Sequence, residues 1–166
     1  MKKKTTWLIF LALLNLIVIA TMQSFGSSLE PYSIIAFEFA GSVEKSNQIV
    51  STWSRNGVLD SVYFLIGFDY LFMVTYSAFL WLACAMLAPV FTGTLSKVFL
   101  GLSFIQPIAA LFDAIENLAL YKIIAGSGDH LWPFLAVLCA MPKFAMVASA
   151  VMACFLGAGY LVVKPK

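Results

Sequence analysis

The chain has 166 residues, of which 62% are hydrophobic and only 11% are charged, whereas soluble domains average about 45–50% apolar and about 25% charged residues. This composition excludes an ordinary water-soluble domain and indicates a membrane protein, with a length that suits one domain. The formal net charge is only +2, and the lysines lie mainly near the two chain ends, so we expect no nucleic-acid partner.

The first apolar stretch covers about residues 7–22 and follows Lys2, Lys3 and Lys4. An α-helix needs about 20 apolar residues to cross a bilayer core about 30 Å thick. A basic start before an apolar run is also typical of a signal peptide, but no clear A-x-A cleavage site follows Ala20. We therefore expect a retained membrane helix, with cleavage as the alternative.

The connection that follows is the only long one. Its residues 31–40 are apolar, and Gly41 and Ser42 then interrupt the run. Ser42 is a candidate N-cap with Glu44 in the first helical turn, and Gly57 lies just past the expected end. We expect an extracytoplasmic cap of one or two short amphipathic helices at about residues 30–57. An ordered loop that only covers the bundle is the alternative.

Three further apolar stretches cover about residues 61–87, 98–125 and 131–163, and short turns connect them. Together with the first stretch they predict an all-α fold. This is an integral membrane four-helix bundle with an extracytoplasmic helical cap between the first two spans. We expect residues 1–166 to form a single transmembrane domain.

The distribution of basic residues predicts the orientation, because cytoplasmic loops are enriched in Lys and Arg. A cytoplasmic N-terminus puts six lysines inside: Lys2, Lys3, Lys4, Lys97, Lys164 and Lys166. It puts only Lys45, Arg55 and Lys122 outside. We therefore expect a multi-pass protein of a bacterial inner (plasma) membrane with both termini in the cytoplasm.

Polar residues inside the spans are the most informative feature, because a charge at the bilayer centre costs roughly 2.5–3.5 kcal/mol on insertion scales. At about 1.5 Å rise per residue, the ionisable ones lie at similar depths, about 12–18 Å below the outer helix ends. We expect them to form one polar cluster that faces the bundle interior. Its candidate residues are Asp69, Tyr76, Gln106, Asp113, Glu116, Asn117 and Lys143, with Glu38 and Arg55 as a possible rim.

Two interpretations of this cluster stay open. Polar contacts between membrane helices are worth about 0.6–2 kcal/mol each, so the residues could serve only to hold the helices together. An excess of acids over the single lysine instead favours a ligand or proton site. The sequence predicts no metal site, because Cys84, Cys139 and Cys154 form no close pair and His130 is the only histidine. We also expect no cofactor.

The segment Leu111–Asn117 reads LFDAIEN, with Phe68-Asp69-Tyr70 upstream and Lys143-Phe144 downstream. It resembles a set of small bacterial four-helix membrane proteins that carry an FD-x-x-EN segment in the third helix. The resemblance spans about residues 37–147. It implies the four-helix layout and that the intramembrane acids belong with Lys143, and it implies no activity.

The sequence favours a non-enzymatic membrane protein that binds a small molecule or lipid from the outer half of the bilayer. One alternative is a structural or accessory subunit with a partner in a membrane complex. Another is a membrane-embedded enzyme with Asp113 or Glu116 as general acid or base, or a proton-coupled transporter acting as a homodimer. Catalytic residues are not indicated, and membrane lipids are the expected surroundings.

Overall fold

The structure, a computed structural model, describes residues 2–163, so Lys164 and Lys166, which the orientation prediction uses, lie outside the described residues. The described part is helical and contains no strand. Its α-helices are α1 (Lys2–Gly26), α2 (Ile34–Glu38), α3 (Val43–Arg55), α4 (Leu59–Leu87), α5 (Gly93–Ile124) and α6 (Leu131–Val163). Short 3-10 turns, η1 (Ser27–Leu29) and η2 (Ala88–Val90), follow α1 and α4.

Within residues 2–163, four helices are long and apolar enough to cross a membrane, namely α1, α4, α5 and α6. The prediction of an all-α chain with four such helices is therefore confirmed. The predicted bounds of α4 and α6 agree closely, but α1 and α5 begin earlier than expected, at Lys2 and Gly93. Hydropathy predicts only the apolar part of a helix. Residues that favour helix, such as lysine, can continue the helix beyond that part.

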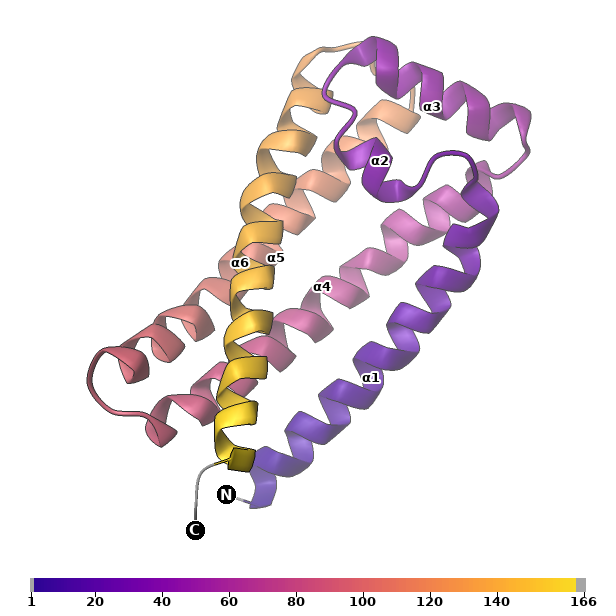
Figure 1. Cartoon of the computed structure of the whole chain (residues 1–166). Coiled ribbons are helices and arrows are strands. Elements are labelled where there is room, and N and C mark those ends of the chain that lie inside the picture. Colours follow the sequence, from indigo (N-terminus) through magenta and orange to yellow (C-terminus); the bar gives the residue numbers. More distant parts are fainter. Residues whose placement is uncertain (1, 164–166) are drawn as a thin grey trace.

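The long helices pack in the order α1, α4, α5, α6, with the most extensive contacts between α5 and α6 and between α4 and α5. Figure 1 shows that the start of α1 and the end of α6 lie at the same end of the bundle. At the opposite end, α3 crosses the bundle and α2 lies beneath it. The bundle thus has one end made of α2 and α3, and another made of the start of α1, the end of α6 and the α4–α5 turn.

Each of the two short helices, α2 and α3, is capped at its N-terminus by a serine just before its first residue. The hydroxyl of Ser33 accepts a hydrogen bond from the Ala36 amide (3.1 Å), and that of Ser42 accepts one from the Lys45 amide (3.2 Å). After α3, Gly57 takes a left-handed conformation with φ of +69°, which glycine adopts at little cost. The predicted N-cap and helix end are therefore both found.

The connecting segment is part of the hydrophobic core. Trp53 is fully buried, its indole N–H donates to the carbonyl oxygens of Leu29 (3.0 Å) and Tyr32 (3.2 Å), and Phe37 packs edge-on against its ring at 5.1 Å. This packing fixes α2 over the ends of α4, α5 and α6. It thereby positions Glu38, the last residue of α2, over the bundle interior.

Candidate functional site

Lys143 of α6 is the centre of a buried ionic network. Its Nζ lies 2.9 Å from Asp113 Oδ1 and 2.9 Å from both carboxylate oxygens of Glu116, which are on α5. It also lies 3.8 Å from Glu38 Oε2 on α2. All four side chains are buried. Since an ion removed from water costs several kcal/mol unless it is well paired, such a convergence of acids is what keeps an ammonium group at this depth.

The acids meet Lys143 because they share one face of α5. Asp113, Glu116 and Asn117 are spaced by three and four residues, which places them one above another on a helix. The same face extends the network to α4: Tyr76 donates its hydroxyl hydrogen to Asp113 Oδ2 (2.9 Å), and the Asn117 amide donates to Asp69 Oδ2 (2.6 Å). The structure thus brings together most of the predicted cluster.

Glu38 comes from outside the long helices, yet only 7% of its surface is exposed. Burial raises the pKa of its carboxyl above the ordinary value of 4.5; Asp113 raises this pKa further, and the positive charge of Lys143 lowers it. Within residues 2–163, Glu38 Oε2 has no hydrogen-bond partner.

Gln106 and Arg55, which the sequence analysis assigned to the cluster and its rim, form hydrogen bonds within their own helices instead. Gln106 is buried, but its amide donates to the Leu102 carbonyl of its own helix (3.0 Å). It lies two turns before Asp113, which is about 10 Å along the axis. Arg55 is exposed at the end of α3, where its guanidinium donates to Ser51 O and Thr52 Oγ1.

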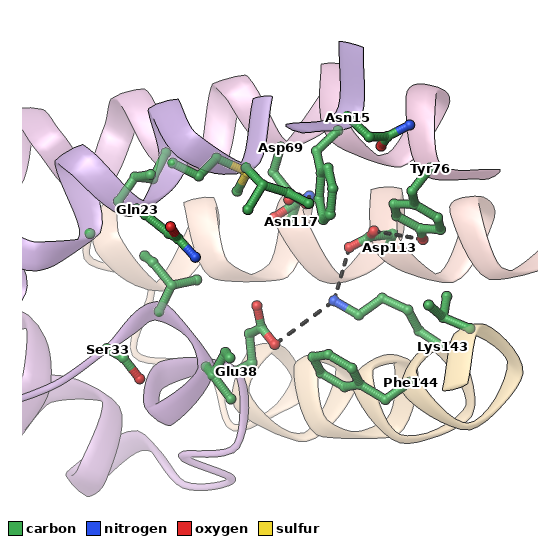
Figure 2. Close-up of a pocket in the computed structure, with 18 of the residues that line it drawn as sticks. Asn15, Gln23, Ser33, Glu38, Asp69, Tyr76, Asp113, Asn117, Lys143 and Phe144 are labelled. Atoms are coloured by element: carbon green, nitrogen blue, oxygen red, sulfur yellow. Dashed lines mark hydrogen bonds and ion pairs between the residues drawn. The ribbon is translucent and has the colours of Figure 1, made fainter. Parts of the chain in front are cut away.

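A pocket of about 830 Å³ lies beside the network, between α1, α4 and α6 and beneath α2. Figure 2 shows Glu38, Asp69, Tyr76, Asp113, Asn117 and Lys143 along it. Most of its remaining surface is apolar and comes from Leu16, Ile19, Met22, Leu65, Ile66, Phe72, Phe79, Leu80, Phe144, Val147 and Val151. Glu116 is not among the lining residues and reaches the pocket only through its contact with Lys143 at 2.9 Å.

The pocket reaches the outer surface of the bundle. Leu16 of α1, Ile35 of α2 and Phe144 of α6 line it and are also exposed, at 63%, 57% and 38%. These three apolar side chains belong to the rim of the opening. The rim is apolar, and two of its three side chains, Leu16 and Phe144, lie on membrane-length helices, so the opening suits an apolar molecule better than a polar one.

The position of α1 depends on two residues that the sequence analysis missed. Asn15 Nδ2 donates to the Thr75 carbonyl (3.1 Å), and the Thr75 hydroxyl donates to Asn15 Oδ1 (3.1 Å). Both side chains are buried between α1 and α4. The signal in the sequence was a single asparagine inside an otherwise apolar span, which is costly in lipid unless it finds a partner.

The chain was compared with models of protein families, with curated proteins and with solved structures. None of the three comparisons finds a match. The described residues form an apolar pocket with a charged floor, and the ammonium group among its lining residues, that of Lys143, lies within 3.8 Å of three carboxyl groups.

Proposed function

We propose that the protein binds an amphiphilic small molecule or lipid in the pocket beneath α2. The observation that carries this proposal is the combination of an 830 Å³ apolar cavity with Glu38, Asp69 and Lys143 on its floor. Ligand sites are typically cavities of about 300–1,000 Å³ with mainly apolar walls and a few convergent polar groups. An amphiphile matches both the apolar walls and the polar floor of the pocket. Its alkyl chain would contact the walls, and its polar end would contact the floor.

The rim supports access from the membrane. Leu16, Ile35 and Phe144 are exposed at the opening, so an alkyl chain passing between α1 and α6 would keep apolar contacts throughout. A water-soluble polar molecule would have to cross the same apolar rim without hydrogen-bond partners, which costs free energy. The ligand is therefore expected to partition into lipid before it binds.

We further propose that the pocket opens in the outer half of a bacterial inner membrane, with both termini in the cytoplasm. In support, the start of α1, the end of α6 and the α4–α5 turn lie at one end of the bundle in Figure 1. The basic residues Lys2, Lys3, Lys4 and Lys97 belong to that end, as the positive-inside rule requires. The helices α2 and α3, and with them the pocket, then lie toward the outer side.

A photolabelling experiment tests the proposed binding. Full-length protein in phosphatidylcholine nanodiscs is irradiated with each of three dodecyl probes, which carry a mid-chain diazirine and end in a primary amine, an alcohol or a carboxylate. We expect at least one probe to label pocket-lining peptides of α1, α4 or α6. The labelled residues are identified by peptide mass spectrometry.

Ile19 and Ile17 of α1 provide a matched pair of variants. Ile19 lines the pocket, whereas Ile17 does not and is 64% exposed on the outer face. Ile19→Trp should occupy the cavity and abolish labelling of the pocket peptides, and Ile17→Trp should leave it unchanged. Equal labelling of both variants, or no labelling of the pocket by any probe, would favour the alternative in which the polar network only holds the helices together.

A further inference from the structure

The polar atoms that remain available in the pocket are acidic. Lys143 Nζ, the one ammonium group among the pocket-lining residues that the structure describes, is within 2.9 Å of Asp113 and Glu116 and within 3.8 Å of Glu38. It has three protons to donate, and the carboxyl groups around it can accept all of them. A ligand anion would have to displace one of these carboxyl groups to reach Lys143.

Glu38 offers an acceptor that makes an ion pair with Lys143 at 3.8 Å but no hydrogen bond within residues 2–163. Its Oε2 is buried, has no hydrogen-bond partner within residues 2–163, and belongs to a side chain that lines the pocket. A buried acceptor left unpaired costs about 1–3 kcal/mol, and more when it is charged. This atom is thus an independent indication that a hydrogen-bond donor belongs in the cavity.

Asp69 provides a second acceptor on another wall of the same pocket. Asn117 occupies its Oδ2 (2.6 Å), and no hydrogen bond to Oδ1 is found in the described part of the chain. Figure 2 shows Glu38 and Asp69 on different sides of the hollow, with Glu38 on α2 and Asp69 on α4. A donor group that enters the pocket therefore meets an acidic acceptor on each of two walls.

From this arrangement we infer that the ligand is a cationic amphiphile, with a protonated amine that pairs with Glu38 and Asp69 and an alkyl body along α1 and α6. The inference rests on the proposed function and adds the charge of the ligand. The network contains four carboxyl groups, those of Glu38, Asp69, Asp113 and Glu116, and one ammonium group. A second cation reduces this imbalance, whereas an anion increases it.

The aromatic side chains of the pocket favour the same charge. Phe72 and Tyr76 pack edge to face at 5.1 Å and both line the cavity, as does Phe144. Lys143 Nζ itself lies over the Phe144 ring, 4.6 Å from the ring centre. Since aromatic faces attract cations, these walls tolerate an ammonium group better than a carboxylate or sulfate.

The three dodecyl probes test this inference, because they differ only in the end group. We expect the amine to label the pocket with an apparent affinity at least about tenfold higher than the alcohol, as a charge-assisted hydrogen bond predicts. The carboxylate should label least. Glu38→Gln and Asp69→Asn should each reduce the affinity for the amine by about tenfold or more and leave labelling by the alcohol nearly unchanged.

Glu30→Gln is the matched control, because Glu30 belongs to the same connection between α1 and α4 but is exposed. It should label as the unaltered protein does. Size-exclusion chromatography and circular dichroism identify any variant that fails to fold, and Asp69→Asn serves if Glu38→Gln is lost in this way. The same labelling by amine and alcohol, or a preference for the carboxylate, would overturn the inference and leave the proposed function standing. Absence of pocket labelling by all three probes would overturn both.

Discussion

The ammonium nitrogen of Lys143 lies 2.9 Å from Oδ1 of Asp113, although the two residues are thirty positions apart on different membrane-length helices. This contact joins α5 to α6 near the floor of the pocket. It makes the network both a structural element and part of the candidate site, so variants have to separate these two roles.

Replacement of Lys143 should destabilise the protein strongly. Lys143→Met retains an unbranched side chain but removes the positive charge. Asp113 and Glu116 then stay buried without their counter-ion. Breaking a buried ion pair in this way costs about 3–5 kcal/mol. Unfolding by urea or heat in detergent micelles, followed by circular dichroism, measures the loss.

The control for this prediction neutralises the partners as well. The triple variant Lys143→Met, Asp113→Asn, Glu116→Gln should regain much of the stability, because no uncompensated charge remains at these positions. A loss below about 1 kcal/mol for Lys143→Met alone, a size typical of an exposed ion pair, would contradict the buried network.

The stability of the protein should depend on pH through Glu38. Burial raises the pKa of Glu38 above 4.5, with Lys143, Asp113 and Glu116 as its charged neighbours and Asp69 in the same pocket. A raised pKa means that the folded state binds the proton more tightly than the unfolded state. The resulting stabilisation is complete below about pH 4.5 and is lost as the pH rises through the raised pKa.

Glu38→Gln fixes the neutral form and should remove this contribution to the pH dependence, whereas Glu30→Gln should retain it. Apparent melting temperatures of the three proteins between about pH 4.5 and pH 8 provide the comparison. An identical fall in the unaltered protein and Glu38→Gln would show that Glu38 does not carry the effect.

Gly157 of α6 should not tolerate a methyl group without repacking. A Cβ atom there would lie 3.0 Å from both Leu87 Cδ1 and Phe99 Cζ, while a Cβ at Gly159 would meet nothing within 4 Å. Both residues are in the same helix and gain helix propensity from alanine. Gly157→Ala should therefore be less stable than Gly159→Ala by about 1–3 kcal/mol, the usual cost of overpacking. Thermal unfolding of the two variants gives this difference, and equal stability would contradict the close packing of α6 on α4 and α5.

Cys84 and Cys154 should form a disulfide on mild oxidation. Their sulfur atoms lie 3.6 Å apart across α4 and α6, and a disulfide requires about 2.05 Å. Treatment with a membrane-permeant oxidant, then maleimide labelling of the denatured protein, counts the remaining thiols by mass. We expect only Cys139 to be labelled. In Cys84→Ser, Cys139 and Cys154 should both stay reactive, and loss of thiols in that variant would point to other pairings.

Local patterns in the sequence predicted much of the fold. The Ser42 cap and the turn at Gly57 follow from residues within a few positions of each other. The shared face of Asp113, Glu116 and Asn117 follows from helical spacing alone. Their contacts with Lys143 required only that the polar faces of neighbouring helices avoid lipid.

These sequence patterns could not predict the pocket, because the pocket depends on how α1 packs against the other helices. That position is set by Asn15 and Thr75, sixty residues apart in the chain. The spacing of Gln106 matched the acidic face of α5, but same-face residues two turns apart need not touch, and Gln106 bonds within its own helix. Arg55 likewise finds its partners within α3.

The most direct test of the account is an experimental structure of the full-length chain in a lipid nanodisc with dodecylamine. We predict elongated density along Ile19 and Val147, between α1 and α6, that ends within hydrogen-bond distance of Glu38 or Asp69. A structure in which α1 closes onto α6 and leaves no cavity, or in which Lys143 points into the lipid away from Asp113, would contradict it.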